Sequence, residues 1–318
     1  MKQPSTSAGL IVAVIAAVTF GASGAFIKPL LESGWSPAAA VTVRVLIGGL
    51  ALLPIALIAL RGRWDALWRG RWRILGMATV GVAGTQLLYF AAIQSIPVGT
   101  GILIEYMAPL LLVAVVWARS RRMPKAVVLI GSVVALAGLV MVVSPGGSGR
   151  LDIVGLVFAL GAMVGCAVYY VIAARPSDNL PAVALASFGL LLGGAILGLV
   201  GLLGLVPFTA NFGEVPFFEG SAPWWIPMLV VGVVATAIAY ATSIAATEML
   251  GSRLASFVGL LEVVAATFYA WLLLGERLTL VQLLGGLLIL VGIAFVRSEK
   301  TDASLEAASN EPLEPARV

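Results

Sequence analysis

Histidine is absent from the 318 residues, and cysteine occurs once, as Cys166 inside an apolar run. Without histidine the chain lacks the commonest metal ligand and the commonest proton carrier near neutral pH, which excludes a Ser-His-Asp triad and a histidine-based zinc site. A single cysteine excludes a disulfide within the chain. We therefore expect no catalytic residues of these kinds, no bound metal and no cofactor.

Charge is also scarce. Charged residues make up 11% of the sequence, about half the usual share in a soluble domain, whereas 61% of the residues are hydrophobic. The mean hydropathy is +1.08. So little polarity cannot cover a soluble fold of this size, and continuous apolar runs are unlike the alternating strands of a transmembrane barrel. The composition predicts an all-α membrane protein. The net charge of +4 does not indicate nucleic-acid binding, because the basic residues lie beside the apolar runs.

Ten apolar segments have the length of a transmembrane helix. A hydrocarbon core of roughly 30 Å requires about 18–24 residues. The segments are predicted near residues 9–30, 38–60, 74–93, 99–118, 126–143, 153–174, 182–205, 224–246, 254–274 and 280–296. The tail at 297–318 is polar and rich in Glu, Ala and Ser, so we expect it to be disordered and cytoplasmic.

Basic residues are distributed unequally between alternate loops. Of the 19 Lys and Arg residues, Arg44 lies within a segment; with the N-terminus inside, 15 lie on the inner side and 3 on the outer side. Because Lys and Arg concentrate in cytoplasmic loops, both termini are predicted to lie inside, in the cytoplasmic (inner) membrane. Trp64, Trp68 and Trp72 recur every four residues and predict a helical face at the inner surface of the lipid bilayer.

The two halves of the sequence resemble each other. A shift of 154 residues aligns Trp117 with Trp271, and nearer the start of each half a shift of about 145 aligns Gly48-Gly49 with Gly193-Gly194. The same shift of 154 aligns Gly131 with Gly285 and Gly138 with Gly292. The predicted divisions are a first repeat at 1–143, a loop at 144–152 and a second repeat at 153–296. Five segments in each repeat, an odd number, predict that the second repeat is inverted, an arrangement typical of alternating access.

Particular motifs carry a resemblance to a known family. They are Ala108-Pro109 in the first repeat and, in the second, Leu261-Glu262-Val263 and the stretch from Trp271 to Leu278. On these residues the chain resembles the drug/metabolite transporter superfamily, specifically the EamA-type ten-span exporters. The family usually has Glu-Pro where this chain has Glu262-Val263, and a Gly-Glu pair where it has Arg121-Arg122. Residues 89–99 and the Glu105 segment are most similar to the threonine/homoserine exporter branch, which implies outward movement of small amino acids or related metabolites.

Three ionisable residues lie within the predicted segments: Arg44, Glu105 and Glu262. Glu105 is followed four residues later by Pro109, which cannot donate a backbone hydrogen bond and so favours a kink. Under the shift of 154 the two glutamates lie on the same helix face, one turn apart, and we expect both to face the axis between the repeats. They either bind an amino group and exchange a proton, or join helices through hydrogen bonds. Arg44 either holds a substrate carboxylate, pairs with Glu105, or has a structural role.

Five polar side chains on apolar helices complete the predicted substrate site: Tyr89, Gln94, Tyr106, Tyr169 and Tyr240. Taken singly, each of these residue types fits a packed or interfacial side chain better than a ligand. The proton-coupling candidates are the two glutamates, because a carboxyl that is removed from water holds a proton more readily.

The prediction is a secondary transporter, not an enzyme, that exports small metabolites such as amino acids. Alternatives are a multidrug or organic cation exporter, a non-transporting membrane scaffold and an intramembrane enzyme. The sequence has no Walker motif, so we expect that ATP does not drive it directly. The expected partners are a small-molecule substrate and the lipid bilayer, without nucleic acid, and the chain is expected to be a monomer or homodimer.

Overall fold

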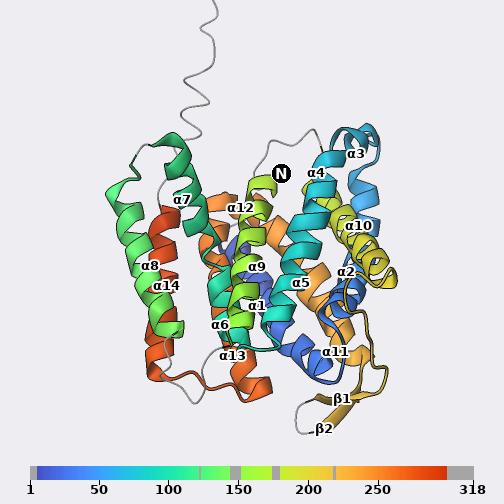
Figure 1. Ribbon diagram of the computed structural model, residues 1–318. Coiled ribbons are helices and arrows are strands. Elements are labelled where there is room, and N and C mark those ends of the chain that lie inside the picture. Colours follow the sequence, from blue (N-terminus) through green and yellow to red (C-terminus); the bar gives the residue numbers. More distant parts are fainter. Residues whose placement is uncertain (1–5, 122, 144–151, 174–179, 218–219, 299–318) are drawn as a thin grey trace, which may run out of the picture.

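The computed structural model describes residues 6–121, 123–143, 152–173, 180–217 and 220–298. Helices dominate, and they are grouped side by side in one bundle (Figure 1). In chain order the elements are α1 (Thr6–Glu32), α2 (Pro37–Ala59), α3 (Asp65–Arg69), α4 (Arg71–Gly76), η1 (Met77–Gly84), α5 (Thr85–Ala92), α6 (Val98–Glu105), α7 (Ala108–Ser120), α8 (Ala126–Val143), α9 (Ile153–Ala173), α10 (Ala182–Leu202), β1 (Glu214–Phe217), β2 (Gly220–Pro223), α11 (Trp225–Leu229), η2 (Val230–Ile238), α12 (Ala239–Gly259), α13 (Leu261–Leu274) and α14 (Leu280–Ser298).

Six helical stretches within the described residues are long and apolar enough to cross a membrane. They are residues 7–32, 37–59, 71–92, 98–119, 182–202 and 225–246. Shorter apolar helices of 10–17 residues occupy the four other predicted segments, in α8, α9, α13 and α14. The predicted loop at 144–152 and the predicted tail at 297–318 lie outside the described residues, except for Asp152 and positions 297 and 298.

One element departs from the predicted all-α architecture. β1 and β2 form an antiparallel hairpin, with Val215 opposite Ala222. The segment before α11 is interrupted by prolines and glycines and cannot continue a helix, whereas Val215 and Phe217 favour an extended strand. Val215 is buried against the bundle, which fixes the hairpin in place.

The predicted start of the ninth segment at Leu254 is wrong. α12 continues without interruption from Ala239 to Gly259, and α13 begins at Leu261. The residues Gly251-Ser252-Arg253 suggested a loop, but none of them prevents a helix from continuing. The true interruption is at Leu260.

Backbone irregularities recur at the shift of 154 residues. α6 ends at Glu105 and α12 ends at Gly259, so both halves interrupt a helix at the same place in the repeat. The π-helical segments η1 and η2 also occupy corresponding positions. α7 and α13 both end in a left-handed residue, Arg121 with φ 53° and Gly275 with φ 65°. The repeat therefore extends from the sequence to the details of the backbone.

α8 and α14 cross at paired glycines. A Cβ atom at Gly138 would lie 2.4 Å from the carbonyl oxygen of Gly285, and one at Gly131 would lie 2.7 Å from that of Gly292. Such close backbone contact requires residues without a side chain. The order of contacts is reversed along the second helix, so α8 and α14 run antiparallel. Because Gly131 corresponds to Gly285 and Gly138 to Gly292, each contact is the counterpart of the other.

A second pair of corresponding helices repeats this pattern. A Cβ at Gly49 of α2 would lie 2.8 Å from Cγ of Leu191 on α10, and a Cβ at Gly194 of α10 would lie 2.8 Å from Cγ of Leu46 on α2. The shift of 145 converts one contact into the other. Reciprocal contacts in two helix pairs are what a pseudo-twofold axis between the halves produces.

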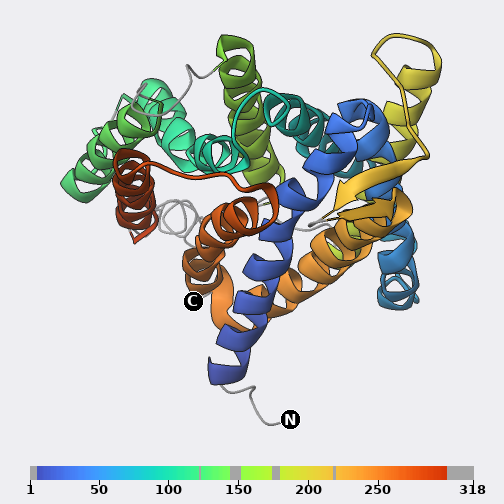
Figure 2. The ribbon, with the colours of Figure 1, turned by 90° about the horizontal axis from the view of Figure 1, so that it is seen from below.

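The two ends of the bundle differ in chemistry (Figure 1). One end, called here the arginine end, carries α3, α4 and the last turn of α7, with Arg61, Arg63, Arg69, Arg71, Arg73, Arg119 and Arg121. The opposite end, called the hairpin end, carries β1, β2 and the loop after α13. There Trp35 is 2% exposed, packs on Phe212 and Trp224, and donates from Nε1 to the carbonyl of Asn211 at 2.7 Å. Seen from that end, α1 runs through the middle of the bundle (Figure 2).

Candidate functional site

Arg44 lies on α2 within the bundle, and 3% of the residue is exposed. It donates from Nε to Oγ1 of Thr236 at 2.9 Å, from Nη1 to Oε1 of Gln86 at 2.6 Å, and from Nη2 to the carbonyl of Ala235 at 3.4 Å. Its guanidinium carbon lies 5.3 Å from the ring centre of Phe90. Three of the five guanidinium N–H groups thus have acceptors among the described residues, and two remain.

The π-helical geometry of η2 provides two of these acceptors. A π-helix leaves room that an α-helix does not, and such segments are frequent at functional sites. Thr236 donates its hydroxyl to the carbonyl of Val231 at 2.8 Å and keeps its lone pairs for Arg44. The close approach of α2 depends on Gly48, where a Cβ would lie 2.4 Å from Cγ2 of Thr236. Arg44 therefore joins α2 of the first half to η2 of the second.

Two carboxyl groups face this region from the interrupted helices. Glu105 is the last residue of α6, and Glu262 lies in the first turn of α13. Both interact electrostatically with Arg44, as do Tyr89 and Tyr240. No ion pair joins Arg44 to either glutamate among the described residues. The carboxyl groups therefore interact with the guanidinium without direct contact.

Tyr106 connects the two interruptions. It caps the C-terminal end of α6 and donates its hydroxyl to Oε2 of Glu262 on α13. An acidic side chain in the first turn of a helix is stabilised by the helix dipole, which favours Glu262 where it stands. The polar centre, defined here as Arg44, Tyr89, Glu105, Tyr106, Tyr240 and Glu262, combines residues from both halves of the chain.

The two remaining predicted residues, Tyr169 and Gln94, lie on elements that carry no member of the polar centre. Tyr169 is half-buried on α9, and its Cδ2 would lie 3.3 Å from a Cβ at Gly81 of η1. Gln94 is exposed in the turn between α5 and α6, because α5 ends at Ala92. The structure does not bring Gln94 to the polar centre.

The prediction of the site missed Thr236. Its hydroxyl is one polar atom in an apolar run, and no sequence signal marks the π-helical turn that presents it to Arg44. Gln86, a further polar side chain in the third predicted segment, was identifiable from the sequence as an amide in an apolar run, but its pairing with Arg44 was not.

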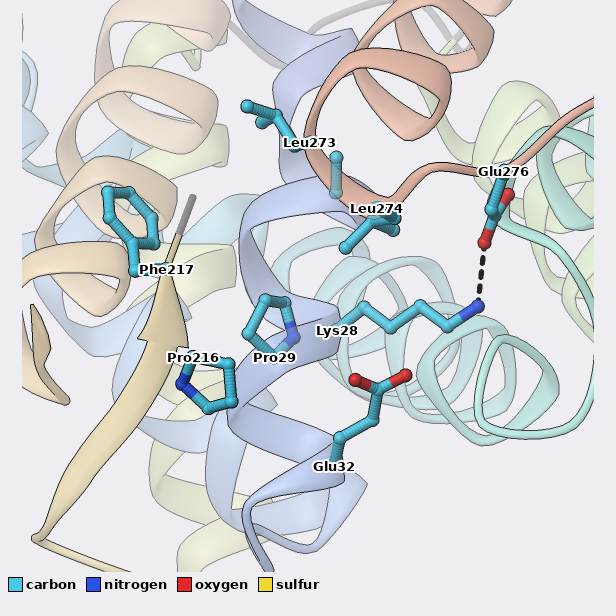
Figure 3. Close-up of a pocket in the computed structure, with 9 residues that line it drawn as sticks. Lys28, Pro29, Glu32, Pro216, Phe217, Leu273, Leu274 and Glu276 are labelled. Atoms are coloured by element: carbon cyan, nitrogen blue, oxygen red, sulfur yellow. Dashed lines mark hydrogen bonds and ion pairs between the residues drawn. The ribbon is translucent and has the colours of Figure 1, made fainter. Parts of the chain in front are cut away.

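A cavity of about 230 Å³ lies at the hairpin end, outside the predicted site. Its lining residues are Ala25, Lys28, Pro29, Glu32, Pro216, Phe217, Leu273, Leu274 and Glu276. Figure 3 shows the Lys28 side chain extending from α1 toward Glu276, to which Nζ donates at 2.6 Å. Among the residues that the structure describes, no group of three or more His, Cys, Asp or Glu side chains could hold a metal ion.

Comparison with known proteins assigns the family. The model of the EamA-like transporter family matches residues 7–144 and again residues 153–298. The chain belongs to this family. It is similar to the uncharacterized inner membrane transporter YicL of Salmonella typhimurium, with 24% identity over 92% of this chain and 96% of that protein. It is 30% identical to the threonine/homoserine exporter RhtA of Escherichia coli over 74% of this chain and 75% of that protein.

A solved crystal structure shares the fold, with a TM-score of 0.61 and 20% identity over 92% of this chain and 98% of the other. Together with the long apolar helices, the family establishes a multi-pass membrane protein. The function is transport, and the relatives are named as transporters rather than enzymes, which agrees with the sequence-based prediction.

Proposed function

We propose that this EamA-like transporter exports small amino acids or related metabolites across the cytoplasmic membrane by alternating access. The observation that carries the proposal is the polar centre, in which Arg44 and two carboxyl groups gather between the halves of the chain. Ionisable groups inside a membrane are costly, so they tend to persist where they bind or move a solute.

The chemistry of the polar centre suits a zwitterion. Two N–H groups of Arg44 are available for a substrate carboxylate, and a planar guanidinium binds a carboxylate through two parallel hydrogen bonds. Glu105 and Glu262 would hold the ammonium group at the other end of the substrate. Requiring both charges selects amino acids against amines and simple carboxylates. The similarity to a threonine/homoserine exporter supports this substrate class.

Alternating access would follow from ten transmembrane helices in two inverted repeats, 1–143 and 153–296, joined by the loop at 144–152. The antiparallel pairing of α8 with α14 supports this arrangement, because corresponding helices of inverted units must run in opposite directions. Basic residues concentrate in cytoplasmic loops, so the arginine end and both termini would lie in the cytoplasm. Exchange of conformation between similar halves opens a central site to each side in turn.

Proton exchange would drive the export. One guanidinium and two carboxyl groups are electrically neutral together when one carboxyl is protonated, and such neutrality lowers the cost of burial. Because Glu262 already accepts a hydrogen bond from Tyr106, the proton would sit on Glu105, where a substrate ammonium can replace it. Inward movement of protons would thus be coupled to outward movement of substrate.

An organic cation exporter is the second candidate. The excess of carboxyl groups over guanidinium groups in the polar centre favours it, because a cation without a carboxylate could bind there while Arg44 keeps its present partners.

Reconstitution in liposomes separates these candidates. Uptake of labelled threonine, homoserine, alanine and two organic cations is measured with the lumen at pH 6 and the outside at pH 7.5, and without the gradient. We expect saturable uptake of amino acids that the gradient accelerates. Uptake of cations without amino acids would favour the second candidate, and uptake of neither class would contradict both.

A further inference from the structure

We propose that Lys28 and Glu276 form a gate at the hairpin end of the transport path, closed in this structure. This inference rests on the proposed transport function, because a gate acts only in a chain that moves a solute. It assigns a role to two charged residues that take no part in the polar centre.

The Glu276 carboxylate ties three elements together. Oε1 accepts from Nζ of Lys28 at 2.6 Å, and Oε2 accepts from the backbone N–H of Val98 at 3.0 Å. The two charged side chains are 16% and 15% exposed, so water screens their attraction less than it would at the surface. One carboxylate therefore holds α1, the first turn of α6 and the loop before α14 against each other.

Two buried hydroxyls without partners lie a few residues along the chain from this ion pair, one on α1 and one on α6. The hydroxyls of Ser23 on α1 and Thr100 on α6 are buried, and neither has a hydrogen-bond partner among the described residues. Ser23 precedes Lys28 by five residues, and Thr100 follows Val98 by two. A buried hydroxyl without a partner is unfavourable. A polar solute that reached these hydroxyls would supply the missing hydrogen bonds.

α1 and α6 approach each other closely beside the ion pair, at Gly24 and Val98. A Cβ at Gly24 would lie 2.5 Å from Cγ1 of Val98 and 2.7 Å from the hydroxyl of Tyr89, a member of the polar centre. On the other side of the ion pair lies the cavity of about 230 Å³ (Figure 3). The ion pair thus stands between an accessible cavity and a closed contact that reaches the polar centre.

The positions that correspond to Glu276 and Val98 in the other half of the repeat do not reproduce this arrangement. The shift of 154 places Arg122, a cation, at the position that corresponds to Glu276. Val98 begins a helix, so its N–H is free to bind Glu276, but the corresponding Ser252 lies inside the uninterrupted α12. Within the described residues, the proposed gate is therefore a feature of the hairpin end that the repeat does not reproduce.

Accessibility of a single cysteine tests the gate without requiring transport. In the Cys166→Ser background, Thr100→Cys places the one thiol of the chain at a position that is 0% exposed. The protein is placed in lipid nanodiscs, which expose both faces of the membrane to the solution, and is labelled with a maleimide. We expect Glu276→Gln and Lys28→Met each to raise the labelling rate at least fivefold. The exchange Lys28→Glu with Glu276→Lys should restore part of the slow rate, because it remakes the ion pair but not the bond from Val98.

Asp65→Asn is the matched control, because it breaks a different ion pair, Arg69–Asp65, at the arginine end and should leave labelling unchanged. Thermal melting identifies variants that fail to fold. Lys28→Met removes the ion pair but keeps the hydrogen bond from Val98 to Glu276, so it tests the ion pair alone. Equal labelling of both single variants and the parent would overturn the gate even if transport is observed. Faster labelling without any transport would retain the gated opening and reject the proposed function.

Discussion

At the scale of single residues, Arg44 carries a permanent charge away from water and holds it with neutral acceptors. Gln86 and Thr236 provide two of them at 2.6 and 2.9 Å, while Glu105 and Glu262 remain near without forming an ion pair. A buried charge normally requires a close counter-charge or complete hydrogen bonding. Two N–H groups of Arg44 have no acceptor among the described residues, and the proposed carboxylate recognition rests on these two groups.

Arg44→Lys tests whether the planar guanidinium is needed rather than the charge alone. A lysine keeps the charge but cannot hold Thr236, Gln86 and a carboxylate in one plane. We expect the initial rate of amino-acid uptake in liposomes to fall about tenfold or more, equivalent to roughly 1.4 kcal/mol. Thr236→Ser keeps the hydroxyl and serves as the control, with near-parent uptake. Parent-like uptake by Arg44→Gln would exclude a role in binding.

The corresponding helix caps Arg121 and Gly275 offer a test of the repeat at one backbone position. Both have positive φ, which costs a residue with a side chain about 1–2 kcal/mol but costs glycine almost nothing. We expect Gly275→Ala to lower the free energy of unfolding by about 1 kcal/mol, and Arg121→Gly to raise it by up to the same amount. Thermal melting of the two purified variants in the same detergent measures both changes in stability. A stabilised Gly275→Ala together with a destabilised Arg121→Gly would refute the equivalence of the two caps.

At the scale of helices, the irregular segments place the site. η1 and η2 precede α5 and α12, which carry Tyr89 and Tyr240, while the interruptions after Glu105 and before Leu261 bring the ends of helices to the polar centre. A helix end presents unpaired backbone groups, and within a membrane such groups are tolerated where protein or a water-filled cavity surrounds them. Because the helix is interrupted at the same position in both halves, each half contributes a helix end to the polar centre.

The crossing of α8 and α14 predicts the effect of adding a side chain there. Gly138→Val would force atoms into the carbonyl of Gly285, and overpacking of this kind costs typically 1–3 kcal/mol. We expect a clear fall in melting temperature in detergent, and a similar fall for Gly285→Val, because a Cβ there would lie 2.7 Å from the carbonyl oxygen of Gly138. Gly220→Ala in β2, which has no other atom within 4 Å of its added Cβ, should melt like the parent. Unchanged melting of both valine variants would mean that the helices do not meet at these glycines.

Sequence reasoning located the apolar helices because hydropathy and length act locally, and it anticipated the break near Glu105 from Pro109. It placed the start of the ninth segment wrongly, because Gly251-Ser252-Arg253 has loop-like composition but no residue that stops a helix. It placed Gln94 in the site because a polar side chain beside an apolar run is expected to face the interior, whereas α5 ends at Ala92 and Gln94 lies in the exposed turn. The contact of Lys28 with Glu276, 248 residues apart, depends on tertiary packing and could not be read from local patterns.

At the scale of the whole molecule, the proposed orientation places the arginine end on the cytoplasmic side of the membrane and the hairpin end on the outer side. In the Cys166→Ser background, Ser221→Cys reports on the hairpin end and Trp68→Cys, at a position that is 72% exposed, on the arginine end. We expect a membrane-impermeant maleimide to label position 221 in intact spheroplasts, but to label position 68 only after the membrane is permeabilised. Labelling of position 68 in intact spheroplasts would reverse or reject the proposed orientation.

The central claim is that the polar centre between the halves binds the substrate and exchanges a proton for it. Threonine uptake into liposomes with an acidic lumen, by the parent and by Glu105→Gln side by side, tests this claim most directly. We predict that the gradient accelerates uptake by the parent severalfold and has no effect on Glu105→Gln, because the amide cannot carry the proton. An equal response to the gradient in both proteins would contradict the account.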